Sequence, residues 1–221
     1  MKRFISIMFL VVALVIMTVP VSAYDITVTR EAGTFQEGFG GGEFTITPTV
    51  GGNSFQSFCL EENEHVSIGS SYFTSFQGGA INGGVSGGNP DPISVGTAWL
   101  YNQFTTQVWE PGLSYNYTPG SDRVASAGQL QNTIWWLEGA PDNNGNGNTF
   151  GLAVIAKFGD EVSAKLDNTQ YPVRVMNLWV NEDLTGNAQD MLSTSVPEPT
   201  SLLLLGLGLV GLAGLSRKLR K

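Results

Sequence analysis

The sequence of 221 residues has only one cysteine and one histidine. A single cysteine cannot form an intramolecular disulfide, so its thiol is free, paired with another molecule or engaged in a different bond. One cysteine and one histidine are also too few for a zinc site of the usual kind, and no glycine-rich phosphate-binding loop is present. We therefore expect no metal, no cofactor and no enzymatic activity.

Basic residues are scarce in the middle of the chain. Of 11 lysines and arginines, six lie near the two ends, at positions 2–3 and 217–221. The stretch between the two ends holds the remaining five basic residues and 18 of the 19 acidic residues. This negative charge disfavours nucleic acid and anionic lipid as partners, and is compatible with a cation-binding or simply well-solvated surface.

The first 23 residues have the features of a secretory signal. A basic start is followed by an apolar run over residues 4–17 and by small residues at its end. We predict cleavage between Ala23 and Tyr24. Residues 24–195 then form an exported domain of ordinary size.

The other end carries a second targeting pattern. Pro197-Glu198-Pro199 precedes an apolar run over residues 202–215 and a basic tail. The run is short for a membrane span, and its basic flank predicts a cytoplasmic terminus. Residues 196–221 resemble the PEP-CTERM sorting signal of exopolysaccharide-producing Gram-negative bacteria.

That resemblance implies an inner-membrane intermediate, delivered by the secretion machinery and cleaved by a membrane exosortase at the three-residue motif. The product would be released or attached at the cell surface. The alternative is an ordinary single-pass membrane anchor.

Glycine-rich turns and alternating segments favour strands over a helical bundle. We expect an α+β fold, mainly β, with a sandwich- or barrel-like sheet and two or three packed helices. The strands are predicted at 24–29, 43–50, 55–60 and 171–180, and the helices at 91–104, 123–138 and 150–166. Residues 72–90 are expected to be a flexible excursion, with Asp91-Pro92 starting the first helix, and residues after 181 a polar stretch.

The cysteine lies near the end of the third predicted strand. Alternation places Cys59 on one side of it, and Phe58 and Leu60 on the other. The acidic turn 61–64 follows directly. Nearby carboxylates raise the pKa of a thiol, which argues against a resting thiolate nucleophile.

A glutamine borders the apolar stripe of the second predicted helix. Gln131 is four residues from both Ala127 and Trp135, so its amide is half turned toward the core. Such an amide needs a hydrogen-bond partner, because leaving it without one costs about 1 to 3 kcal/mol.

Two segments together resemble the thioester domains of bacterial surface adhesins. They are Phe58-Cys59-Leu60-Glu61 and Gln131-Asn132-Thr133-Ile134-Trp135, with threonine where that family usually has alanine. The resemblance implies a thioester between Cys59 and Gln131, formed with loss of ammonia and surrounded by Phe58, Glu61, Ile134 and Trp135. It also implies covalent attachment to an amine-bearing surface or to an exopolysaccharide matrix. The alternative is a buried thiol and a glutamine bonded to backbone.

Three further candidates are weaker. His65 is six residues from Cys59, and we expect it to be an exposed turn residue rather than the base of a hydrolase. Residues 142–148 imitate half of a calcium loop, but Ala153 occupies the position of the bidentate glutamate, so an ordinary turn is expected. The tryptophans could include a sugar-stacking platform, although no pattern selects one.

These features predict an exported surface or matrix protein associated with exopolysaccharide and biofilm, with covalent adhesion through Cys59 and Gln131. The alternatives are a structural matrix protein without a reactive bond and a carbohydrate-binding module.

Overall fold

A computed structural model describes residues 26–34, 41–81, 88–141 and 144–194. All of them belong to one compact unit, Ala23–Val196. The expected signal with its cleavage site at Ala23 and Tyr24, the sorting motif and the apolar run 202–215 lie outside the described residues. Across the described ranges, no helix combines the length and apolar character needed to cross a bilayer.

The main sheet is antiparallel and has the strand order β3-β2-β1-β4-β7-β8. Its strands are β1 (Ile26–Thr29), β2 (Phe44–Pro48), β3 (Phe55–Ser57), β4 (Ser71–Gln77), β7 (Arg174–Trp179) and β8 (Asn187–Ser193). A small second sheet pairs β5 (Gly79–Ala80) with β6 (Asp91–Pro92).

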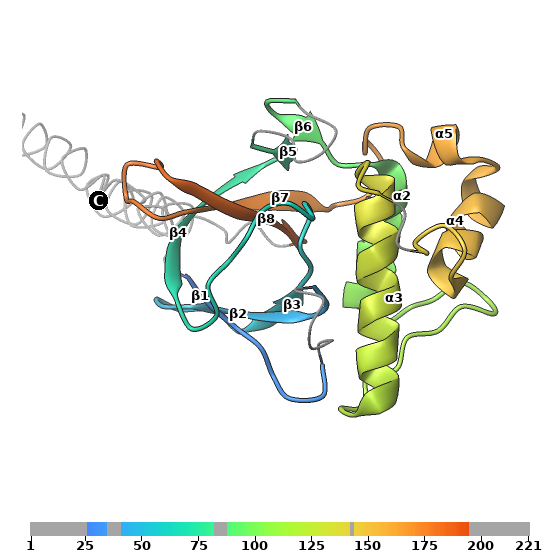
Figure 1. The fold of residues 1–221 in the computed structure, drawn as a ribbon, viewed down its shortest axis with the longest axis horizontal. Helices are drawn as coiled ribbons and strands as arrows, with labels where there is room; N and C mark the ends of the chain where they lie inside the picture. Colours follow the sequence, from blue (N-terminus) through green and yellow to red (C-terminus); the bar gives the residue numbers. More distant parts are fainter. Residues whose placement is uncertain (1–25, 35–40, 82–87, 142–143, 195–221) are drawn as a thin grey trace, which may run out of the picture. The chain divides into compact units, whose positions relative to one another are not determined.

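The main sheet is strongly curled (Figure 1), and the segment after β3 joins its two edges. The segment that follows β3 hydrogen-bonds to β8: Leu60 N donates to Asp190 O at 2.8 Å, and Leu192 N donates to Phe58 O at 3.1 Å. The sheet is therefore barrel-like, as the sequence predicted.

The helices stand together on one side of the curled sheet (Figure 1). They are α2 (Val95–Thr106), α3 (Ser121–Leu137), α4 (Thr149–Phe158) and the short α5 (Glu161–Ala164). The predicted start of α2 at Asp91-Pro92 is wrong, because both residues belong to β6. Ser94 is the N-cap instead, and its Oγ accepts a hydrogen bond from Thr97 N at 3.0 Å.

The buried apolar side chains form two clusters. The helix-facing core joins the helices to one side of the sheet and includes Phe58, Leu60, Ala127, Leu130 and Ile134. The sheet core includes Ile26, Phe44, Cys59, Met176 and Met191, together with Trp135 from α3. These clusters confirm the expected α+β architecture with helices packed on a curled sheet.

Two other expectations are wrong. Residues 72–90 contain most of β4, which lies between β1 and β7. The stretch after residue 181 is polar as expected, but it also contains β8, for which no strand was predicted. The single helix expected at 150–166 ends at Gly159, which has a φ of +92° and caps α4. Of its expected apolar face, Leu152, Val162 and Leu166 are exposed.

Candidate functional site

Cys59 lies where the curled sheet closes. It pairs with Met191 of β8 in an antiparallel bridge, its thiol is free, and its side chain belongs to the sheet core. Its neighbours Phe58 and Leu60 belong to the helix-facing core. The alternation predicted from the sequence is therefore confirmed.

Gln131 of α3 pairs with the backbone of Cys59. Since the closing hydrogen bonds come from residues 58 and 60, the N–H and C=O of Cys59 point away from β8. Cys59 N donates to Gln131 Oε1 at 3.1 Å, and Gln131 Nε2 donates to Cys59 O at 2.8 Å. The fold thus brings together the two residues that the sequence singled out, 72 positions apart.

The pair is shielded from water. Cys59 is 3% exposed and Gln131 is 1% exposed. Gly42 N donates a longer hydrogen bond, 3.4 Å, to the same Gln131 Oε1. The oxygen and the nitrogen of this amide are thereby directed at backbone rather than at solvent.

Burial controls the acidity of the thiol. The pKa of Cys59 is raised to about 12, mainly by desolvation; the positive charge of Arg30 opposes this shift and the negative charge of Glu64 adds to it. The thiol is therefore protonated at neutral pH. The direction agrees with the sequence-based expectation, but burial rather than the acidic turn is the main cause.

The other residues predicted to surround the thioester lie partly in the helix-facing core and partly in the sheet core. Phe58 packs edge-on against Phe104 with 5.0 Å between ring centroids, and Ile134 is buried in the same helix-facing core. Trp135 lies in the sheet core with Cys59. Glu61 is only 2% exposed, and its desolvation, with the nearby charge of Glu138, raises its pKa to about 8.

The threonine that departs from the thioester-domain pattern faces away from the pair. Thr133 Oγ1 donates to Gln129 O or Gly145 O, each at 3.0 Å, and also lies 3.0 Å from Asn148 Oδ1. Thr133 therefore holds the loop before α4, and its side chain does not occupy the space of the Gln131 amide.

Within the described ranges, the weaker candidates gain no catalytic or metal-binding neighbours. His65 is exposed whereas Cys59 is buried. Asn148, from the calcium-like loop, is the N-cap of α4, while residues 142–143 lie outside the described ranges. Among the residues described, no three acidic, histidine or cysteine side chains form a group that could hold a metal ion. None of the five tryptophans, all of which the structure describes, is exposed.

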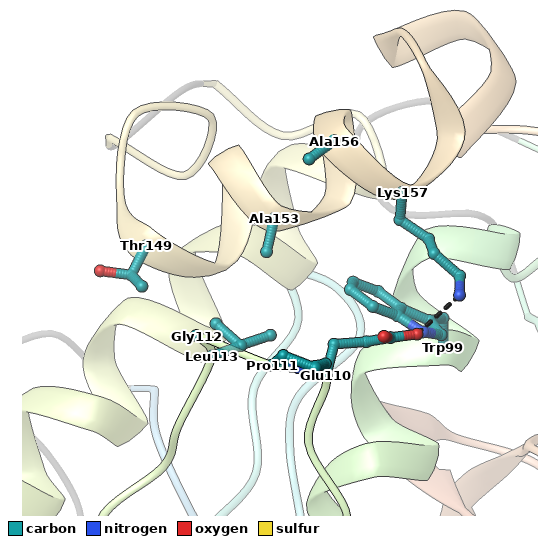
Figure 2. A pocket seen from close by; sticks show the side chains of 9 residues that line it. All are labelled: Trp99, Glu110, Pro111, Gly112, Leu113, Thr149, Ala153, Ala156 and Lys157. Carbon is teal, nitrogen blue, oxygen red and sulfur yellow. Dashed lines mark hydrogen bonds and ion pairs between the residues drawn. The ribbon is translucent and has the colours of Figure 1, made fainter.

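A separate pocket of about 340 Å³ lies between α2, α4 and the loop 110–113 (Figure 2). Trp99 forms part of its wall, and Lys157 Nζ reaches across to Glu110 Oε1 at 2.7 Å. The lining residues include neither Cys59 nor Gln131.

Comparison with known proteins gives one match, to a family described as the PEP-CTERM protein-sorting motif, over residues 195–218. No curated protein and no solved structure matches the chain. The matched residues lie outside those that the structure describes. The chain therefore carries an exosortase sorting motif, which indicates an exported protein that passes through the membrane to the cell surface.

Proposed function

We propose that this exported protein is a covalent surface adhesin, in which Cys59 Sγ and the side-chain carbonyl of Gln131 form an internal thioester. The observation that supports the proposal is the paired hydrogen bonding between the Gln131 amide and the Cys59 backbone in a buried position. None of the comparisons matches a thioester domain, so the proposal rests on this geometry and on the two sequence segments.

The chemistry needs no cofactor. The thiol adds to the amide carbon of Gln131, the C–N bond breaks, and the thiol proton leaves with the nitrogen as ammonia. An amine on a partner surface later attacks the thioester, which forms a new amide at residue 131 and returns the free thiol of Cys59. Each molecule therefore makes one covalent bond to its partner.

Proximity is the main physical support for this reaction. With a pKa of about 12, the buried thiol of Cys59 is protonated at neutral pH, and a protonated thiol is a poor nucleophile. Fixing two reacting groups in a productive orientation can lower a barrier by about 7 to 11 kcal/mol, which is the kind of contribution that an unactivated amide requires. The same burial slows hydrolysis of the thioester once it has formed, because water is excluded from the site.

The second candidate is a structural surface or matrix protein without a reactive bond. One observation favours it: the Gln131 amide satisfies both backbone groups of Cys59 at the edge of β8, which is a stabilising role by itself. The biofilm and exopolysaccharide setting is shared by both candidates. The burial or half-burial of every tryptophan argues against the carbohydrate-binding module.

Intact mass of the exported protein, purified without amines or reductant, separates the candidates. We expect a deficit of one ammonia relative to the processed chain, and incorporation of methylamine on incubation. Cys59→Ala and Gln131→Glu should abolish both. Gln129→Glu is the matched control, because Gln129 is exposed on the same helix and should leave both unchanged. Full mass with an alkylatable thiol would leave the structural candidate.

A further inference from the structure

The Gln131 side-chain oxygen is the acceptor of two backbone N–H groups from different parts of the chain. Cys59 N lies 3.1 Å from Oε1 and Gly42 N lies 3.4 Å from it. An amide oxygen has two lone pairs, and here both are used by backbone N–H groups rather than by water or a side chain. Two donors aimed at one carbonyl oxygen are the arrangement that stabilises a developing negative charge.

We propose that the N–H groups of Cys59 and Gly42 form an oxyanion hole for acyl transfer at Gln131, and that Gly41 and Arg123 are positioning residues for the second donor. This inference rests on the proposed thioester. It adds a specific stabilisation of the charge that forms on Oε1 during the reaction.

The charge on this oxygen is transient. When Sγ adds to the amide carbon, the C=O electron pair moves to Oε1 and a tetrahedral intermediate forms. Collapse restores the carbonyl and expels ammonia with the thiol proton. Amine attack on the thioester passes through an intermediate with the same oxyanion, so both directions of acyl transfer use the two N–H groups.

Glycine at position 41 is needed for the second donor to approach. A Cβ there would lie 2.6 Å from Gln131 Cγ and 2.6 Å from Trp135 Cη2, both much closer than real Cβ contacts. Gly42 has a φ of +109°, which favours glycine. The two glycines therefore let the backbone lie directly against the Gln131 side chain.

An ion pair holds this backbone onto the helix that carries Gln131. Glu43 follows the glycines directly, has no exposed surface, and accepts hydrogen bonds from Arg123 Nε at 2.6 Å and Nη2 at 2.9 Å. Arg123 and Gln131 are both on α3, so one helix fixes the donor strand and the acceptor amide. The bidentate geometry restricts sliding of residues 41–43 along α3.

The test is Gly41→Ala, with Gly78→Ala as its matched control. No atom lies within 4 Å of the place that a Cβ at position 78 would take, so alanine there meets open space. We expect Gly41→Ala to slow methylamine incorporation by about tenfold or more, since loss of one oxyanion donor typically costs about 10²- to 10³-fold. Gly78→Ala should react at the wild-type rate.

A second measurement distinguishes an oxyanion hole from a general loosening of the site. With ¹³C-labelled glutamine, infrared spectroscopy isolates the thioester C=O stretch, which hydrogen bonding lowers. Gly41→Ala should move it to higher wavenumber, and Gly78→Ala should not. Should Gly41→Ala fail to fold, G41A/W135F replaces it with W135F as reference, because phenylalanine lacks the ring atoms nearest the added Cβ.

Each outcome has a distinct meaning. Slower reaction with a raised stretch supports the inference. An unchanged rate, or a slower rate with an unchanged stretch, overturns it while leaving the thioester in place. A wild-type protein of full mass would remove the proposed function, and this inference with it.

Discussion

The amide of Gln131 takes the place that a neighbouring strand would occupy beside Cys59. Its oxygen and nitrogen meet the N–H and C=O of one residue, as two backbone groups would in a ladder. At the residue scale, the sequence alone shows that Gln131, at the border of an apolar stripe, needs a hydrogen-bond partner. The identity of that partner follows from the fold, because the N–H and C=O of Cys59 point away from β8 and meet the Gln131 amide of α3.

Loss of Arg123 should be costly to the stability of the domain. Arg123→Met leaves the fully buried Glu43 without its bidentate partner, and we expect a loss of about 3 to 5 kcal/mol in the free energy of unfolding. Urea denaturation measures this change. The control is Lys157→Met, which breaks the exposed pair with Glu110 and should cost less than about 1 kcal/mol. Equal losses would contradict this interpretation of the buried pair.

Buried carboxyl groups should make the domain less stable in alkaline solution. Desolvation raises the pKa of Glu61 to about 8, and those of Glu138 and Asp190 to about 7. The folded state therefore binds protons more tightly than the unfolded chain does. The contribution of these groups to the free energy of unfolding is fully present below the ordinary carboxyl pKa. That contribution is lost as the pH rises to about 8.

We expect the free energy of unfolding to fall by at least about 2 kcal/mol between about pH 5 and pH 8.5. Glu61→Gln should flatten this dependence, because glutamine has the same shape and no proton to lose. Glu182→Gln, at an exposed position, should leave it unchanged. A wild-type stability that rises over this range would refute the assignment.

At the scale of elements, local signals identified α3 and the central strand β7. Residues 130, 134 and 137 of α3 lie in the helix-facing core at helical spacing, and β7 is buried on both faces. The sequence does not reveal β8, because Asn187, Gln189 and Asp190 are polar in a strand that is buried by its neighbours. Asp190 is satisfied by Asn177 Nδ2 at 2.9 Å and by Ile81 N, contacts from distant segments.

Asn148 should be the most sensitive position of the loop before α4. Its Oδ1 accepts from Phe150 N at 2.9 Å and from Gly151 N at 3.2 Å, and its Nδ2 donates to Gln129 O of α3 at 2.9 Å. Asn148→Ala should cost about 1 to 2 kcal/mol as a lost N-cap. Thermal or urea unfolding measures it, with the exposed neighbour Thr149→Ala as control. A control as destabilised as the variant would exclude a capping role.

For the whole molecule, the two halves of the candidate site were recognisable in the sequence, but the contribution of the glycine segment was not. Gly42 is 89 positions from Gln131, to which it donates the second hydrogen bond, and nothing local distinguishes it or Gly41 from other glycines. Their role depends on the fold, which brings residues 41–43, directly before β2, against α3.

The sorting motif predicts how the whole molecule is processed. Glu198→Ala should block cleavage in the exporting cell, so that an uncleaved, membrane-associated form accumulates. Intact mass and fractionation of the cells measure this form. Glu182→Ala, which changes an exposed glutamate of the described domain, should be processed normally. Normal processing of both variants would remove the motif as the recognition element.

The position of β8 has a mechanical consequence. It ends at Ser193, two residues before the matched sorting motif begins, so in a molecule held at its C-terminal end tension enters the domain through this strand. β8 is bonded along one edge to β7 and along the other to residues 58–60. A pull along β8 loads these bonds in shear, all at once, and the strand that carries the load is the one against which Cys59 rests.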